Sequence, residues 1–351
     1  MWYHSYDGEY RNLYATSLDG VAWQKPDLGL VTFNGSEVNN LFLRRTAEDH
    51  LPQVIHTPWE TDPAVRYKLV NFDYGRTPPD HLTSGFYGAT STDGIVWQDA
   101  ADNPILPDPG DVGNFVWDVH RQRYLGYPKV YANIRGFSRR CVGFSSTVDF
   151  EHWPPAQLIL TPDELDDFWT AGGGQRTEFY GLSGFPYEAG YLGFLWLFHI
   201  TDGNNDGPIH CELVSSRDGM SWTRQAAQAG RRMPMLALGA PGRWDDGMVF
   251  TPNHPLVEGD TIKLWYGGFG STHNQTGVTE SASIGLATLR KDGFASLDAG
   301  SAIGTVTTKR FQALRGDLHV NVCATNGWLR VEVLDRNGAV LLGYSRADCV
   351  P

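Results

Sequence analysis

The chain has 351 residues, 41% hydrophobic and 19% charged, so it can bury a core and does not have the composition of a disordered protein. Its net charge of −12, without a run of basic residues, argues against nucleic acid and anionic membranes as partners. No stretch approaches the roughly 18 apolar residues of a membrane span. We expect no signal peptide at Met1 and no disulfide scaffold, because the chain opens on strand-like residues and its four cysteines lie far apart.

A short tag recurs along the chain. Ser91–Trp97 reads Ser-Thr-Asp-Gly-Ile-Val-Trp, and Ser17–Trp23 and Ser216–Trp222 share its Ser-x-Asp-Gly-x-x-Trp pattern. Ser146–Trp153 and Thr288–Phe294 are looser copies. Asp-Gly between apolar runs indicates a hairpin turn, and a repeat at this scale indicates an array of similar supersecondary units.

Each tag follows a short alternating strand, which is itself preceded by a strand rich in aromatic and β-branched residues. Four of the five units begin with a further, innermost strand. In chain order we expect strands at Met1–Tyr6 and Asn12–Ala15; Leu51–Ile55, Tyr67–Phe72 and Gly85–Ala89; Asn114–Val119, Arg123–Val130 and Arg140–Phe144; Thr177–Leu182, Tyr191–His199 and His210–Val214; Gly247–Thr251, Thr261–Gly267 and Ser283–Ala287. Outer strands are expected at Leu30–Phe33, Pro104–Leu106, Leu158–Leu160 and Met235–Leu238.

Four short strands a unit, repeated five times, predict an all-β protein with a five-bladed β-propeller over residues 1–294. Thr161–Asp167 is expected to form one helical turn capped by Thr161. The first unit lacks its innermost strand, which would lie before Met1, so we expect either a fragment or closure by another segment. In residues 295–351, apolar and polar residues alternate over about four strands, which predicts part of a β-sandwich. The expected strands are Gly304–Phe311, Leu318–Ala324, Trp328–Leu334 and Ala339–Tyr344.

Polar residues on the innermost strands of a propeller face one end of its central channel, so they are candidates for a ligand site. The candidates are His56, Trp117, Asp118, Arg176, Glu178, Asp245 and Asp246. Asp118 and Glu178 stand out because carboxylates within strands are disfavoured by propensity and by desolvation. Two converging carboxylates can serve as a proton donor and as a nucleophile or stabiliser of an oxocarbenium-like state.

Structural roles remain open for these residues. Asp118 could cap a hairpin loop, Glu178 could simply pair with Arg176, and Asp245 and Asp246 could shape a turn before a glycine. A single histidine is more often structural than functional. The 12 tryptophans could fill the space between sheets or offer flat faces to a sugar.

The sequence resembles the five-bladed propellers of glycoside hydrolase families 32, 43 and 68, and family 32 most of all. The order of propeller and β-sandwich matches that family. Trp117-Asp118-Val119 stands where the family has an Arg-Asp-Pro motif, and Thr177-Glu178-Phe179 stands where it has a Glu-Cys motif. The resemblance implies that Asp118 stabilises the transition state and that Glu178 is the general acid/base. The family's nucleophile is an Asp on the strand that is missing from the first unit.

We therefore expect a hydrolase of furanosides such as fructosides, acting on an oligo- or polysaccharide by a retaining mechanism. A binding module that holds a sugar without cleaving it, and a pure interaction propeller, are the alternatives. We expect no metal and no cofactor, because no HExxH motif, EF-hand pattern or Cys/His cluster is present. A missing N-terminal segment would be compatible with a secreted or periplasmic protein, and otherwise we expect a cytoplasmic one. The oligomeric state does not follow from the sequence.

Overall fold

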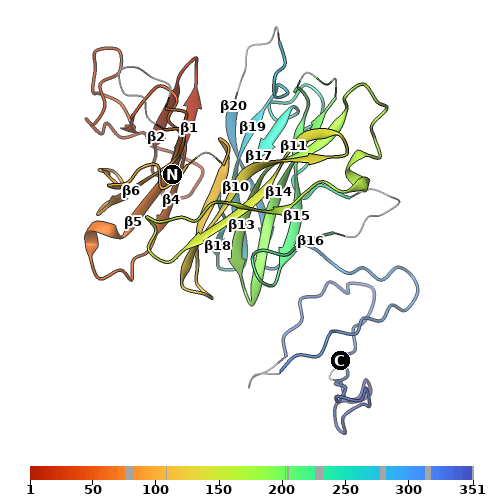
Figure 1. The fold of residues 1–351 in the computed structure, drawn as a ribbon. Helices are drawn as coiled ribbons and strands as arrows, with labels where there is room; N and C mark the ends of the chain where they lie inside the picture. Colours follow the sequence, from red (N-terminus) through yellow and green to blue (C-terminus); the bar gives the residue numbers. More distant parts are fainter. Residues whose placement is uncertain are drawn as a thin grey trace. The chain divides into compact units, whose positions relative to one another are not determined.

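The computed structural model describes residues 1–75, 83–107, 109–201, 203, 205–225, 232–276, 282–312 and 318–349. The chain divides into two compact units, Met1–Leu289 and Arg290–Pro351, which we call the propeller unit and the C-terminal unit. All the strands assigned among the described residues belong to the propeller unit, apart from the last residue of β20 (Figure 1).

The strands follow one another along the chain in five groups, which we call blades 1 to 5. Blade 1 comprises β1 (Trp2–Tyr6), β2 (Tyr10–Tyr14) and β3 (Leu41–Leu43); blade 2 comprises β4 (His50–His56), β5 (Tyr67–Asp73), β6 (Gly85–Ser91), β7 (Gln98–Asp99) and β8 (Leu106–Pro107); blade 3 comprises β9 (Gly113–Asp118), β10 (Arg123–Ile134), β11 (Phe137–Thr147) and β12 (Gln157–Leu160); blade 4 comprises β13 (Arg176–Tyr187), β14 (Gly190–Ile200), β15 (Ile209–Ser216) and β16 (Trp222–Arg224); blade 5 comprises β17 (Met248–Phe250), β18 (Leu256–Glu258), β19 (Thr261–Phe269) and β20 (Ala282–Arg290).

Within each blade the paired strands run antiparallel. Blades 4 and 5 join into one eight-stranded sheet through a single parallel pair, Ile209 with Met248. The last blade also contacts the first, because the indole of Trp265 in β19 donates a hydrogen bond of 2.8 Å to the carbonyl of Gly20. The ring of Trp265 lies 6.0 Å from that of Trp23. The predicted all-β propeller is confirmed.

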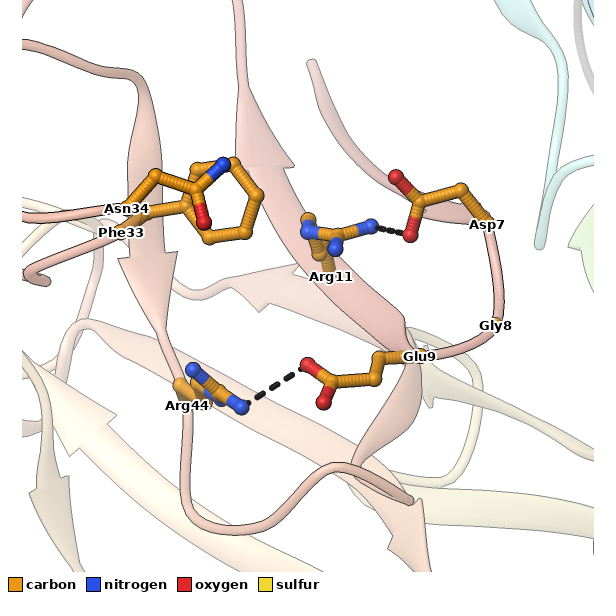
Figure 2. Close-up of a pocket in the computed structure, with 7 residues that line it drawn as sticks. All are labelled: Asp7, Gly8, Glu9, Arg11, Phe33, Asn34 and Arg44. Atoms are coloured by element: carbon orange, nitrogen blue, oxygen red, sulfur yellow. Dashed lines mark hydrogen bonds and ion pairs between the residues drawn. The ribbon is translucent and has the colours of Figure 1, made fainter.

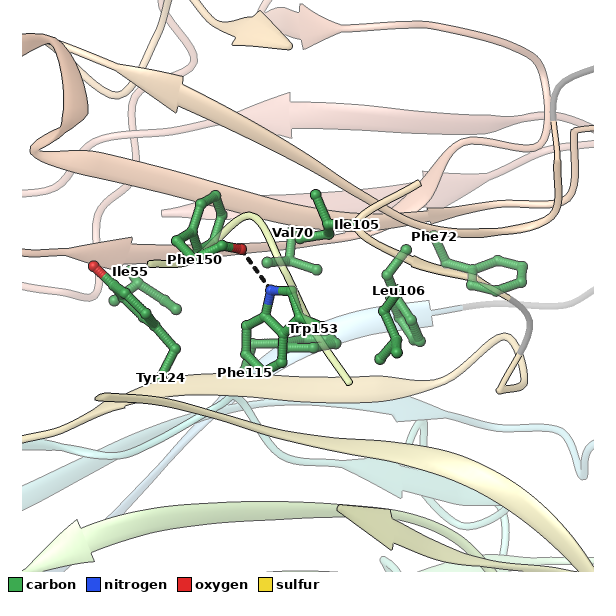
Figure 3. Close-up of a cluster of buried hydrophobic side chains, with 10 residues drawn as sticks. Ile55, Val70, Phe72, Ile105, Leu106, Phe115, Tyr124, Phe150 and Trp153 are labelled. Atoms are coloured by element: carbon green, nitrogen blue, oxygen red, sulfur yellow. Dashed lines mark hydrogen bonds between the residues drawn. The ribbon is translucent and has the colours of Figure 1, made fainter. Parts of the chain in front are cut away.

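The hydrophobic core lies between successive blades. Figure 3 shows the cluster between blades 2 and 3, where Ile55, Val70 and Phe72 face Phe115 and Trp153. Burial of each such side chain stabilises the fold by about 1.5–3 kcal/mol. Similar clusters join blades 1 and 2 and blades 4 and 5, so each blade is stabilised mainly by its neighbours.

The recurring tag forms a hydrogen-bonded turn. In blade 2 the amide of Gly94 donates to Ser91 Oγ at 2.9 Å, while the amides of Ile95 and Val96 donate to Asp93 Oδ1 at 2.8 and 3.0 Å. The tags in blades 1 and 4 repeat all three bonds, and the looser blade 3 copy repeats the two bonds to its aspartate. The motif therefore satisfies the backbone of the turn with its own Ser and Asp side chains.

Some of the short outer elements differ from the predictions, whereas Leu158–Leu160 lies within β12 as expected. Leu41–Leu43, not Leu30–Phe33, is the outer strand of blade 1. In blade 4, Trp222–Arg224 pairs with β15, and the expected segment Met235–Leu238 contributes an isolated bridge between Leu236 and Cys211 of β15. The helical turn is a 3-10 helix at Glu164–Asp167, a second one follows Asp62 at Pro63–Val65, and the first is capped by Asp163 instead of Thr161. Asp163 is the cap because its carboxylate accepts from Leu165 N.

The C-terminal unit contains no strand among its described residues after Arg290, apart from one isolated pair between Leu334 and Val340. The strands that we expected at 304–311, 318–324, 328–334 and 339–344 are not formed there. Apolar residues of these segments, such as Val306, Phe311 and Trp328, are exposed. A single small face of alternating residues has no second sheet to bury it, so the pattern alone does not yield stable strands.

Candidate functional site

Strand direction decides which side chains meet in a blade. The inner strand β9 runs antiparallel to β10, and β13 runs antiparallel to β14. The start of β13 therefore lies beside the end of β14 and the start of β15. The start of β9 lies beside Pro128, in the middle of β10. At this end of blades 3 and 4, charged and aromatic side chains gather. We call them the inner cluster: Tyr74, Asp111, Lys129, Arg140, Arg176, Glu178, Tyr180 and His273.

Glu178 is the most buried acid of the inner cluster, with a side chain only 1% exposed. Arg140 Nη1 lies 2.6 Å from its Oε2, and Arg176 Nε lies 2.7 Å from its Oε1. Arg140 also donates to Asn205 Oδ1 at 2.8 Å. Both carboxylate oxygens thus accept from guanidinium groups, which offsets the cost of burying the charge. The arginines remain partly open to solvent, at 12% and 14%.

Asp111 is the second acid of the inner cluster and lies two residues before β9. Its carboxylate forms an ion pair with Lys129 and accepts a hydrogen bond from the hydroxyl of Tyr74. Burial acts to raise the pKa of Asp111, but the charge of Lys129 and the hydrogen bonds from Lys129 and Tyr74 outweigh it and lower this pKa to about 2. Asp111 is therefore ionised over the whole physiological pH range.

The ring of Tyr180 lies between the Asp111–Lys129 ion pair and the Glu178–Arg140 ion pair. The Lys129 ammonium is 4.9 Å from its ring centroid, and the Arg140 guanidinium is 5.6 Å from it. Its hydroxyl is hydrogen-bonded to His273 Nε2 at 3.0 Å. Burial, together with the charge of Asp111, raises the pKa of Tyr180, and burial lowers the pKa of His273. Both rings are thus neutral hydrogen-bonding groups near neutral pH.

The start of β13 is anchored from outside the inner cluster. Asp167 Oδ1 accepts from the amide of Thr177 at 3.0 Å and from Arg139 Nη1 at 2.9 Å. Arg139 also donates to the carbonyl of Thr177 at 3.1 Å, and its side chain is 1% exposed. Because Thr177 precedes Glu178, this network fixes the backbone that carries the acid.

Asp118 does not join Glu178. It ends β9, and its Oδ1 accepts from the amides of His120 and Arg121 at 2.9 and 3.4 Å, so it caps the β9–β10 hairpin. Its Oδ2 accepts from the hydroxyl of Tyr191 at 2.7 Å. Tyr191 lies seven residues along β14 from Phe198, the partner of Glu178, which corresponds to roughly 20 Å of strand. The two acids therefore lie at opposite ends of the blades.

The other predicted residues fall into three groups. Trp117 and His56 lie towards the same end as Asp118. The ring centroids of Trp117 and Tyr124 are 4.7 Å apart there, and those of the stacked rings of His56 and Tyr67 are 4.3 Å apart. Only Arg176 is brought to Glu178.

Asp245 and Asp246, which precede β17, accept hydrogen bonds within blade 5. Tyr266 donates to Asp245 Oδ2 at 2.9 Å, and Gly242 N donates to Asp246 Oδ2 at 2.5 Å. The bond from Gly242 to Asp246 matches the turn-forming alternative, whereas the bond from Tyr266 ties Asp245 to strand β19, 21 residues further along the chain.

Sequence reasoning missed Asp111, Lys129, Arg140 and Tyr180. One signal was available: Lys129 is a charged residue in the middle of an aromatic and apolar strand, where an ion-pair partner is to be expected. Asp111 follows a Pro-Gly turn, and nothing in that local pattern distinguishes it from an ordinary loop residue.

Among the described residues, no group of three or more His, Cys, Asp or Glu side chains is arranged to hold a metal ion. The part of the chain that the structure describes has no helix long and apolar enough to span a membrane.

The fold defines the chain as an all-β propeller, and solved structures share that fold. BT0996, solved as an RGII complex, is 12% identical, with a TM-score of 0.55, over 82% of this chain and 81% of its own. An N-acetylgalactosamine deacetylase from F. plautii, solved with blood group B trisaccharide, is 14% identical, with a TM-score of 0.50, over 80% and 85%. A glycosyl hydrolase from Bacteroides ovatus is 16% identical, with a TM-score of 0.50, over 82% and 79%.

At these identities the likeness is one of fold. No family model matches the sequence. No curated protein matches it either.

Proposed function

We propose that this protein is a carbohydrate-active propeller, similar to glycoside hydrolases, that takes a furanoside chain such as a fructoside at the inner cluster. The observation that carries the proposal is that two carboxylates from neighbouring blades, Asp111 and Glu178, flank Tyr180 at one end of the inner strands. The fold shared with a glycosyl hydrolase supports it. The polar, partly exposed arginines offer donors to sugar hydroxyls.

In a hydrolytic reaction, Glu178 is the proton donor to the leaving oxygen. Asp111 takes the role that we first gave to Asp118, because its low pKa keeps it negative beside a developing oxocarbenium ion. Among the described residues we assign no nucleophile. Glu178 must carry a proton to act as an acid, so Arg140 or Arg176 has to release one of its oxygens when a sugar enters.

The second candidate is a binding module that holds the sugar without cleaving it. The specific observation in its favour is that both oxygens of Glu178 are engaged by arginines at 2.6 and 2.7 Å. A carboxylate held in this way serves as a fixed acceptor and positions two guanidinium groups for the ligand.

The test uses the purified chain with a panel of mono- to hexasaccharides that includes fructosides and arabinosides. Binding is measured by calorimetry and hydrolysis by sugar release. We expect Glu178→Gln to lower any hydrolysis by about 10²–10⁴-fold and Asp111→Asn to impair it as well. Binding without sugar release by the wild type would support the binding module.

Asp118→Asn is the matched comparison, since it changes an acid at the opposite end of the same inner strand. An effect of Asp118→Asn as large as that of Asp111→Asn would return the stabilising role to Asp118. Full activity of Glu178→Gln would remove Glu178 from the reaction, and failure of the wild type to bind any saccharide would refute the proposed function.

A further inference from the structure

Arg140, Glu178 and Arg176 form a triad in which two cations share one acid. We call it the arginine triad. Arg140 Nη1 lies 2.6 Å from Glu178 Oε2, and Arg176 Nε lies 2.7 Å from Glu178 Oε1. Two guanidinium charges and one carboxylate charge leave one positive charge uncompensated. The whole chain carries a net charge of −12, so this local excess runs against its overall balance.

The neighbouring acids do not supply the missing negative charge. Asp111 already pairs with Lys129. Asp206, on the loop between β14 and β15, uses its Oδ1 to accept from the amides of Gly207 and Asn274 at 2.7 and 2.9 Å. Both carboxylates are therefore engaged by groups outside the arginine triad.

Two other clusters of ion pairs show a balanced arrangement. At the open pocket of blade 1, Arg11 pairs with Asp7 and Arg44 pairs with Glu9, one acid for each guanidinium (Figure 2). In the network that anchors the start of β13, four arginines meet four acids: Arg135, Arg139, Arg224 and Arg232 with Asp163, Asp166, Asp167 and Glu212. The arginine triad differs from both clusters, because its cations outnumber its acids.

The arginine triad is also short of hydrogen-bond acceptors. Arg176 Nη1 donates to the carbonyl of Gly174 at 2.8 Å, but its Nη2 has no partner among the described residues. Arg140 Nε is buried and likewise has no partner in the described part of the chain. The Arg176 guanidinium lies 5.0 Å from the ring centroid of Phe137. Stacking of this kind holds the plane of the guanidinium, whose free edge fits a carboxylate.

We propose that the furanoside chain taken at the inner cluster carries a uronate unit, whose carboxylate pairs with Arg176. This inference rests on the proposed function and names the substrate class of the same site, an acidic saccharide. A carboxylate supplies both the missing negative charge and the acceptor for Nη2, whereas a neutral sugar supplies only an acceptor. A phosphate monoester carries about −1.5 to −2 charges at neutral pH and would overcompensate a single positive charge.

The experiment compares each acid with its uncharged isostere. Calorimetry with the purified chain measures the affinities for D-glucuronate and D-galacturonate, for their amides, and for glucose 6-phosphate and glucose 6-sulfate. We expect each uronate to bind about tenfold more tightly than its amide at low salt. This preference should shrink when the salt concentration is raised to about 0.5 M, because salt screens the charge of a partly exposed guanidinium.

Substitutions at residue 176 separate charge from shape. Arg176→Gln should reduce the affinity for the uronate to that for the amide and leave the affinity for the amide within about twofold. Arg176→Lys should retain part of the preference, because the charge stays and the planar fork is lost. Arg44→Gln is the matched control, since Arg44 pairs with Glu9 at 2.9 Å on blade 1. This variant should keep the full preference.

The outcomes separate the two proposals. Equal affinity for acid and amide, or binding of neutral furanosides without binding of uronates, would overturn the uronate and leave the proposed function standing. Tighter binding of the phosphate or the sulfate than of the uronates would also overturn it. A preference that survives in Arg176→Gln would remove Arg176 from the role. If the wild type binds neither these ligands nor any other saccharide, the proposed function fails and the uronate inference fails with it.

Discussion

The ion pair of Asp111 and Lys129 concentrates charge in an otherwise aromatic part of the propeller. Lys129 is only 2% exposed, and burial lowers its pKa against the raising effect of Asp111. A buried ammonium that loses its partner is costly, by about 3–5 kcal/mol. The pair therefore contributes to stability as well as to the candidate site.

Acid should remove the contribution of Asp111. Its pKa is about 2 in the folded chain and 3.8 ordinarily, so this stabilisation is present above about pH 4 and is lost as the pH falls through 2. We expect Asp111→Asn to lower the free energy of unfolding by about 3 kcal/mol at neutral pH. About 2 kcal/mol of that difference should disappear between about pH 4 and pH 2. Urea unfolding followed by tryptophan fluorescence measures it, and a pH-independent difference would contradict the assignment.

The contrast between Asp111 and Asp118 shows why the site was only partly predictable. The sequence placed both inner strands correctly, and Glu178 with Arg176 followed from that. The pairing of the inner strands with β10 and β14 decides which end of each inner strand faces the ligand. A pattern of alternating residues does not specify that pairing. Asp118 at a strand end satisfies two amides of a tight turn, as an aspartate before a hairpin commonly does.

At the scale of the element, the tag is a self-contained turn. Its Asp carboxylate accepts from successive amides, and these bonds lower the pKa of Asp93 although burial acts to raise it. The turn residue Gly94 has φ of +77°, and an added Cβ would lie 2.8 Å from Trp2 Cζ2. The same turn thus closes its own hairpin and packs against a ring from the preceding blade.

We expect Asp93→Ala to lower the free energy of unfolding by about 1–2 kcal/mol, since it removes the acceptor of the amides of Ile95 and Val96. Asp102→Ala, at an exposed aspartate of the same blade, should change it by less than about 0.5 kcal/mol. Thermal and urea unfolding of the two variants gives the comparison. Equal stability of both variants and wild type would mean that the tag is held by packing alone.

Strand prediction succeeded where a strand is long and packed on both faces, as in β10 and β14. It failed for the outer strands of blades 1 and 4, because Leu41–Leu43 and Trp222–Arg224 are only three residues long, whereas the expected Leu158–Leu160 lies within β12. A stretch of that length has no periodicity to detect, and the choice among apolar segments is made by pairing with the preceding strand.

At the scale of the molecule, ring closure depends on a few contacts between blades 5 and 1. Gly20 has φ of +76°, and an added Cβ would lie 2.5 Å from Trp265 Cζ2. Trp265 also donates to the carbonyl of Gly20. The indole therefore occupies the space that the missing side chain leaves.

A double-mutant cycle tests this closure. We expect Trp265→Ala to lower the free energy of unfolding by about 2–3 kcal/mol and Gly20→Ala to lower it by at least about 2 kcal/mol. When residue 265 is already alanine, the loss caused by Gly20→Ala should be smaller by about 1 kcal/mol. Gly29→Ala is the control, because Gly29 has φ of +67° and nothing within 4 Å of an added Cβ. Additive effects in urea unfolding would mean that the indole does not set the requirement for glycine.

The C-terminal unit shows the limit of prediction at this scale. Alternation between residues 304 and 344 favours strands, but strands form when a partner sheet buries their apolar face. Phe311, Leu318 and Trp328 stay exposed. A pattern in one segment cannot supply the surface against which that segment would fold.

The hydrogen bonds between aromatic rings and tags have a consequence for how the number of blades can change during evolution. Trp2 donates to the carbonyl of Gly94, Tyr127 to that of Gly219, and Trp265 to that of Gly20. Each junction pairs a ring donor with a main-chain acceptor, which any residue carries. A blade copied or recombined with its tag and its ring intact would find an acceptor at its new neighbour without a matching side-chain substitution there. The number of blades could thus change by gene duplication more readily than the chemistry at their inner ends.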